Sequence, residues 1–393
     1  MAAALAAASG CQRTPPPAGR AQPSTAVASP DLGGEAAALT SAARCGECHG
    51  KMEGEWRRSA HARADVSPLY RAMRADAGTP GCDRCHAPLR ALAPGDKVVA
   101  EGVTCEVCHT IASVQVGRLG GAGFLLHLED RVRYGPLCDA KPQYFHTMGC
   151  SPLHAEAEFC AACHDLSREL PGGGSLAVFP EYSEWRDEPP TVVGLSCQHC
   201  HMPAERAEVA VGSPARPSVR SHSFQLRGEL RARALSGRAR VSLVAGRLRV
   251  LLSLKNSGAG HAVPTGLPEH RLRVGVELLD EAGRVLAQLE HSYGRILVDA
   301  ADREVPFYTA VRQRADTRIR PGEIRDDTFE LDSAGASGRL RIFVEWRSIA
   351  PALAAMLGVT PPPDEPMLAA VLPLPLPAAA RRPGEATVVE LKP

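Results

Sequence analysis

The residues with the most evident chemistry are cysteines and histidines that repeat in one spacing. Five segments follow the pattern Cys-x-x-Cys-His, and their cysteines are Cys45, Cys48, Cys82, Cys85, Cys105, Cys108, Cys160, Cys163, Cys197 and Cys200. In this pattern the two thiols bond to the vinyl groups of one porphyrin, and the histidine that follows ligates the iron. The sequence therefore predicts five covalently bound haem c groups whose proximal iron ligands are His49, His86, His109, His164 and His201.

Zinc held by the Cys-x-x-Cys pairs is the alternative interpretation of the same cysteines. A zinc site does not require a histidine directly after each pair, whereas all five pairs here have one. Haem attachment is therefore the favoured interpretation.

The remaining histidines decide what lies on the opposite side of each iron. The candidates for distal ligands are His61, His146, His154 and His222. Of these, His61 follows a tryptophan that could pack against a porphyrin. Two axial histidines saturate the iron, which suits electron transfer, whereas an open position allows chemistry.

Five histidines have other interpretations. His127 and His261 stay open as alternatives for the fifth haem. His199 lies inside its own attachment segment and cannot easily reach an iron. His270 and His291 fall on predicted strands, so we interpret them as ordinary residues of that region.

Composition indicates which elements must position these residues. The chain of 393 residues is long enough for two or three domains, and its 45 Lys+Arg against 44 Asp+Glu give no basic excess that would indicate nucleic-acid binding. Aromatic residues make up only 4% of the chain, so porphyrin faces are expected to supply the missing apolar bulk. We predict a mostly helical or irregular haem domain over 39–227, with short helices in 41–63 and 153–168.

The pattern of apolar and polar residues changes after this domain. Alternation of apolar and polar residues predicts strands over 239–245, 247–256, 271–280, 284–293, 323–331 and 339–346. This spacing is typical of an antiparallel, immunoglobulin-like β-sandwich, which we place at 228–350. The proline-rich segment 351–393 could add an edge strand. The predicted fold class is α + β, with the haem domain first.

The N-terminus indicates export. Residues 1–11 are interpreted as a signal peptide with a lipoprotein cleavage site, in which Cys11 becomes lipidated, and a cleaved soluble form is the alternative. The Pro- and Ala-rich residues 12–38 then form a disordered tether. The expected location is the periplasmic or cell-surface side of a bacterial membrane, where the leftover Cys138 and Cys150 most simply form a disulfide, two buried thiols being the alternative.

Longer stretches around the motifs resemble a known family. CGECHG with EGEWRRSAHA, then GCDRCHAPLR and EGVTCEVCHTI, resemble the tetrahaem cytochrome of ammonia oxidisers, and AEFCAACHD with EYSEW and CQHCHMP is similar to later sites of the multihaem group that includes hydroxylamine oxidoreductase. The resemblance covers about 41–205 and implies stacked haem pairs, mostly bis-histidine ligation and electron relay. It makes His61, His146 and His154 natural distal ligands. This sequence departs from the family pattern in having five attachment sites, not four or eight, and in having an added β-rich region.

Three functions remain open from the sequence. The leading hypothesis is a carrier that passes electrons between redox partners such as cytochromes or a quinol-linked membrane complex. The second is an oxidoreductase that acts on a small nitrogen or sulfur species at one five-coordinate haem. Nothing singles out a tyrosine for such chemistry among Tyr70, Tyr134, Tyr144 and Tyr182, and no Cys-x-x-Cys-Lys segment occurs. In the third hypothesis the β-sandwich is the functional part and binds a partner, while the haem domain serves as its redox-active support.

Overall fold

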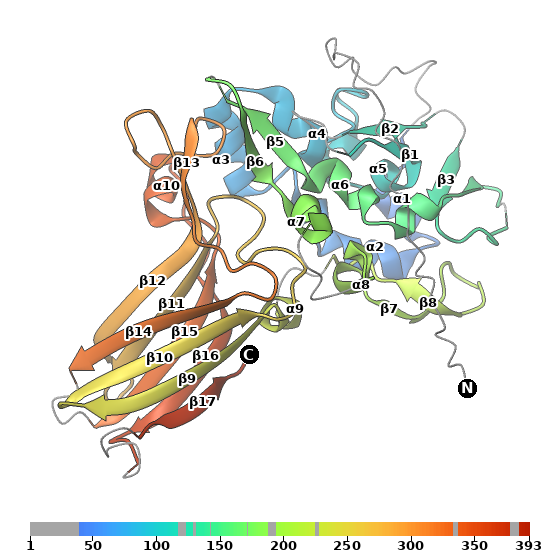
Figure 1. The fold of residues 1–393 in the computed structure, drawn as a ribbon. Helices are drawn as coiled ribbons and strands as arrows, with labels where there is room; N and C mark the ends of the chain where they lie inside the picture. Colours follow the sequence, from blue (N-terminus) through green and yellow to red (C-terminus); the bar gives the residue numbers. More distant parts are fainter. Residues whose placement is uncertain are drawn as a thin grey trace, which may run out of the picture.

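Short helices and two-stranded sheets form the half of the protein that carries the five motifs, and long strands form the other half (Figure 1). The computed structural model describes residues 39–393 except 117–122, 129–130, 142, 171, 188–193, 225–227, 333–336 and 378–384. The predicted signal segment, Cys11 and the predicted tether lie outside the described residues. A mixed α and β fold is confirmed.

The helices of the first half are short, as predicted for 41–63 and 153–168. They are α1 (Ala42–Gly46), α2 (Gly50–Arg57), η1 (His61–Arg63), α3 (Pro68–Ala77), η2 (Pro80–Cys82), α4 (Asp83–His86), η3 (Lys97–Glu101), α5 (Cys105–Thr110), η4 (Pro152–Ala155), α6 (Glu158–His164), α7 (Glu181–Asp187), α8 (Cys197–His201) and α9 (Glu229–Arg233). Helices this short are not stable in isolation, so packing must hold them.

Four small sheets lie between these helices. Their strands are β1 (Ile111–Val114) with β2 (Phe124–Leu126), β3 (Val132–Gly135) with β4 (Thr147–Cys150), β5 (Leu166–Glu169) with β6 (Ser175–Phe179), and β7 (Ala204–Ala207) with β8 (Arg216–Arg220). The predicted disulfide between Cys138 and Cys150 is confirmed, and it links the end of β4 to the loop after β3.

The long strands form two antiparallel sheets. Their order is β14 (Ile324–Asp332), β10 (Arg247–Asn256), β9 (Leu235–Val244), β17 (Thr387–Leu391) in one, and β13 (Arg312–Asp316), β12 (Val285–Val298), β11 (Arg271–Leu279), β15 (Gly338–Arg347), β16 (Glu365–Leu374) in the other. One core cluster combines buried side chains from both sheets, among them Val250, Leu252, Val274 and Ile342. The two sheets therefore pack face to face, and we call this unit, 235–391, the β-sandwich.

The predicted hairpins occur at the expected turns. β9 and β10 pair on either side of Ala245 and Gly246, and both turn residues have positive φ. The alternation of buried and exposed residues along β10 has the period of two that predicted it.

Residues beyond 350 contribute more than the single edge strand that the sequence suggested. After α10 (Pro351–Met356), β16 forms an edge of the five-stranded sheet and β17 an edge of the four-stranded sheet. The C-terminal segment therefore completes both sheets.

The β-sandwich packs directly on the haem-motif half. Leu176 of β6 shares a cluster with Leu297 and Ala310, and Leu69 of α3 packs against a cluster that contains Ile349 and Leu353. The buried Arg295 also donates to the carbonyl of Val178 at 3.0 Å. The two halves therefore share apolar and polar contacts. Within the described part of the chain, none of the helices combines the length and apolar character needed to cross a membrane.

Candidate haem-binding site

Three attachment motifs lie within one short helix each, namely α5, α6 and α8, and this explains their spacing. The second motif runs from η2 into α4, and the first begins in α1 and ends at His49, directly before α2. In an α-helix, residues separated by three or four positions lie on the same face. Within α5, for example, Cys105, Cys108 and His109 occupy positions i, i+3 and i+4. The local fold therefore presents both thiols and the imidazole to the same side, where one porphyrin can meet all three.

Three of the motif histidines are oriented by backbone carbonyls. Nδ1 of His49 lies 2.5 Å from the carbonyl oxygen of Val209, that of His86 lies 3.1 Å from Ala64, and that of His109 lies 2.7 Å from Tyr134. A histidine whose Nδ1–H donates to a carbonyl has its Nε2 lone pair available to a metal.

Several other histidines face the motif histidines at a characteristic separation. With a metal–nitrogen bond of about 2 Å and about 1 Å from nitrogen to ring centre, two imidazoles on opposite sides of one iron have centres about 6 Å apart. The observed ring centres are 6.2 Å apart for His49 and His146, 6.4 Å for His61 and His164, 6.1 Å for His109 and His222, and 6.4 Å for His201 and His261. The residues therefore fit haem iron at four motifs.

Two histidines approach His109, but they are oriented differently. The ring of His154 lies 5.9 Å from His109, yet its Nε2 is 3.0 Å from the carbonyl oxygen of Cys108. His222 instead directs Nδ1 to the carbonyl of Arg220 at 3.1 Å, as the motif histidines do. The second arrangement leaves Nε2 available, so His222 fits a ligand role better than His154.

The two histidines left open by the sequence lie in different places. His261 faces His201, with an interplanar angle of 18°. His127 is exposed, and its Nδ1 lies 3.2 Å from the hydroxyl of Tyr134. The other histidines lie where the sequence suggested: His199 interacts with Ser196, and His291 is on β12. His270 precedes β11 and contacts Trp346.

His86 has a different neighbour. All fourteen histidines are among the described residues, and the ring that packs on His86 is Tyr70, 4.1 Å away and nearly parallel. The Tyr70 hydroxyl donates to Asp83 at 2.7 Å, which fixes the phenol against the imidazole. Among the described residues, no histidine ring opposes His86 in the way that rings oppose the other four.

Burial keeps the imidazoles of His61 and His109 neutral, which is the form that binds metals. Desolvation, together with neighbouring histidines, lowers the pKa of His61 to about 3, and desolvation likewise lowers that of His109 to about 3. Among the described residues, the buried Nδ1 atoms of His61 and His146 have no hydrogen-bond partner. Such atoms fit a site that is completed by a group from outside the chain.

The attachment motifs are neighbours in space as well as being alike in sequence. The thiol of Cys45 is in hydrogen-bond contact with Cys105, that of Cys160 with Cys197, and that of Cys163 with Cys85. Cys108 of the third motif interacts electrostatically with both Cys160 and Cys163 of the fourth motif. It therefore links the first and third motifs to the second, fourth and fifth. The five motifs therefore form one continuous cluster. The described residues hold no group of three or more His, Cys, Asp or Glu side chains arranged to bind a bare metal ion.

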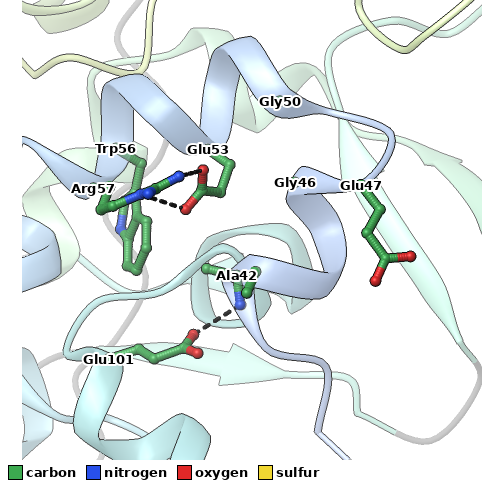
Figure 2. Close-up of a pocket in the computed structure, with 9 residues that line it drawn as sticks. Ala42, Gly46, Glu47, Gly50, Glu53, Trp56, Arg57 and Glu101 are labelled. Carbon is green, nitrogen blue, oxygen red and sulfur yellow. Dashed lines mark hydrogen bonds and ion pairs between the residues drawn. The ribbon is translucent and has the colours of Figure 1, made fainter.

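A cavity of about 600 Å³ lies beside the first motif, between α1 and α2 (Figure 2). Gly46, Glu47 and Glu53 line it, together with Trp56, whose indole N–H donates to the carbonyl of Val103 at 2.8 Å. Its lining includes neither the thiols of this motif nor His49, so the cavity is not itself the haem-attachment site.

Sequence reasoning missed the acidic residues that hold the His261 loop. Glu181 and Glu184 lie on α7 of the haem-motif half and accept hydrogen bonds from backbone amides of the loop in the β-sandwich. They belong to the segment EYSEW, which is part of the family resemblance, but no local signal shows that their partner is a loop 78 to 85 residues further along the chain.

Comparison with known proteins gives a fold. No family model matches the chain, and no curated protein matches it. Among solved structures it is similar to a penta-heme cytochrome c552 from Thermochromatium tepidum, with a TM-score of 0.67 and 21% identity over 86% of this chain and 99% of that chain. The chain therefore has the fold of a multihaem c-type cytochrome. The relation to the ammonia-oxidiser and hydroxylamine oxidoreductase group stays a prediction.

Proposed function

We propose that this protein is an exported five-haem c-type cytochrome that carries electrons between redox partners outside the cytoplasm. The observation that carries the proposal is the proximity of the five motifs in space. Thiol pairs join the first motif to the third, the second to the fourth and the fourth to the fifth, and Cys108 of the third motif interacts electrostatically with Cys160 and Cys163 of the fourth. Haem bound at each motif supplies reversible one-electron chemistry of iron. A contiguous set of such groups can pass an electron through the domain.

The chain itself would hold and orient the haem groups. Beyond the ten motif cysteines and five proximal histidines, we assign His146 to the first haem, His222 to the third and His61 to the fourth as distal ligands. This assignment rests on the ring separations and on the burial that keeps the imidazoles neutral. We prefer His222 to His154 because Nε2 of His154 is engaged by a backbone carbonyl.

The chemistry of haem attachment indicates where the protein works. Covalent haem attachment takes place outside the cytoplasmic membrane, so we propose export, with a lipid on Cys11 as the membrane anchor. The partners would be cytochromes or a quinol-linked membrane complex, and the near-neutral composition argues against nucleic acid.

Protein-film voltammetry on the matured protein tests electron transfer, with haem stoichiometry taken from intact mass. We expect five attached haems and reversible non-catalytic current that accounts for all five. Four or fewer haems in fully matured protein would refute the stoichiometry. A large fraction of redox-silent iron would contradict a relay through the whole cluster.

A second candidate function is favoured by the environment of His86. Because no histidine among the described residues opposes it, the second haem is the place where a small nitrogen or sulfur species could bind iron. Cyanide binding to the oxidised protein tests this candidate: one haem should bind it, while the others remain saturated. Catalytic current on addition of hydroxylamine, nitrite or sulfite would favour the oxidoreductase, and its absence would favour the carrier.

A further inference from the structure

The loop between β10 and β11 carries a histidine from the β-sandwich to the last attachment motif. His261 lies in this loop, and His201 ends α8 in the haem-motif half. Their ring centres are 6.4 Å apart, and the rings are inclined by only 18°. The separation is that of two imidazoles on opposite sides of one metal. The two residues come from different halves of the protein.

The orientation of the His261 ring suits a ligand. Its Nδ1 lies 3.2 Å from the carbonyl oxygen of Ala262, so the proton can reside there and Nε2 keeps its lone pair. The same relation to a nearby carbonyl occurs in His222.

The β-sandwich core fixes the position of this loop. Asn256, which is fully buried, donates through its side-chain amide to the carbonyls of His261 at 2.9 Å and Ile319 at 3.0 Å. Its side-chain oxygen accepts from the amide of Ala259 at 3.1 Å. Val263 and Ile319 exchange two backbone hydrogen bonds. Replacing any of these contacts by solvent would be costly, so His261 is held by a rigid support.

The haem-motif half holds the other side of the loop. Glu184 of α7 accepts from the amide of Ala262 at 3.0 Å and pairs with the buried Arg318 at 2.7 Å. Glu181, one helical turn earlier, accepts from the amide of Gly266 at 2.7 Å and from the Thr265 hydroxyl at 3.1 Å. α7 therefore holds the loop at two places that follow His261, namely Ala262 and residues 265–266, and presents His261 to α8.

We propose that the β-sandwich supplies the sixth iron ligand of the haem attached at Cys197 and Cys200, through Nε2 of His261. The proposal rests on the proposed function in one respect, namely that haem is attached at this motif. It gives the β-sandwich a direct role in the redox cluster, because the ligand field of the fifth haem depends on how the two halves dock. A change in that docking would alter ligation and, with it, the reduction potential.

The test replaces His261 by alanine in the full-length matured protein. Electron paramagnetic resonance should show one low-spin haem fewer per molecule and one high-spin haem more, while intact mass still shows five haems. Added imidazole should restore the low-spin count, which a purely structural role would not do. His291→Ala is the matched control. It also removes a histidine of the β-sandwich, but one that pairs with Asp327 and packs against Phe329.

Each outcome decides the proposal. An unchanged low-spin count in His261→Ala would overturn it and leave electron relay intact. Absence of haem from Cys197 and Cys200 would overturn it together with the five-haem stoichiometry. If His261→Ala fails to fold, His261→Met keeps a side chain that can ligate iron and should raise the potential of one haem. An unchanged set of five potentials would overturn the proposal.

Discussion

Glu269 offers a quantitative test of how a buried carboxyl group of the β-sandwich affects stability. Its side chain is 2% exposed, one carboxylate oxygen accepts from the amide of Phe307 at 2.8 Å, and the other is buried without a partner among the described residues. Burial raises its pKa from 4.5 to about 7, although Arg271 and Arg295 oppose the shift. The folded protein therefore holds this proton at a pH where the unfolded chain has released it.

The magnitude follows from the difference between the two pKa values. The difference between a pKa of 4.5 in the unfolded chain and about 7 in the folded protein corresponds to roughly 3 kcal/mol. Because the folded pKa is the higher one, the contribution of Glu269 to stability is complete below pH 4.5 and is lost as the pH rises through 7. Glu269→Gln removes the titration while keeping the shape of the side chain. The variant should lie within about 1 kcal/mol of the wild type near pH 5 and exceed its free energy of unfolding by roughly 3 kcal/mol at pH 8.

The assay is urea unfolding followed by far-ultraviolet circular dichroism at pH 5 and pH 8, with the wild-type value subtracted at each pH so that other titrating groups cancel. Glu281→Gln, at an exposed turn between β11 and β12, is the control for the loss of one negative charge. If the difference between Glu269→Gln and the wild type is equal at both pH values, the carboxyl group is ionised in the folded protein throughout, and the reasoning is wrong.

Three further outcomes are expected. His61→Ala should convert one low-spin haem to high-spin and create a cyanide-binding site without loss of covalent haem; an unchanged resonance spectrum would show that His61 is not a ligand. Cys138→Ser, compared under oxidising and reducing conditions, should lower the free energy of unfolding by about 3 kcal/mol only under oxidising conditions, since the disulfide closes a short loop. Arg318→Met should destabilise the contact between the halves by about 3 kcal/mol or more, because it leaves Glu184 and Asp316 close together without their cation. Limited proteolysis should then cleave the variant faster than the wild type, and equal cleavage rates would contradict this reasoning.

The local parts of the site could be predicted from the sequence, because attachment chemistry imposes a fixed local spacing. The motif cysteines and their histidines needed no long-range information. Which distal histidine faces which motif did need it, since His61 meets His164 and His146 meets His49 only through tertiary packing. For the same reason the sequence could not separate His261 from His127. Their difference lies in a docked loop, not in the neighbouring residues.

The long strands of the β-sandwich were predictable where apolar and polar residues alternate, whereas β16 was not located because prolines interrupt its pattern, and β13 and β17 were not located because they are short. Pro366 and Pro373 lie within β16, and a proline lacks the N–H that a central strand must donate. The prolines are tolerated because β16 is an edge strand of its sheet, paired along its length with β15 and bridged on the other side only at Ala369, to Lys392, among the described residues. The immunoglobulin-like topology and the exact domain boundaries stay predictions.

The inclination of the imidazole planes distinguishes one iron from the others. The rings of His61 and His164 are inclined by 63°, whereas the other opposed pairs are inclined by 18° to 29°. When two ligand planes cross steeply, the two iron d orbitals of π symmetry become nearly equal in energy, and the magnetic anisotropy of the ferric ion grows. A haem bound between His61 and His164, as proposed above, should therefore have a g tensor unlike those of haems at the other motifs. Spectroscopy could then follow the oxidation state of this haem separately in the intact protein.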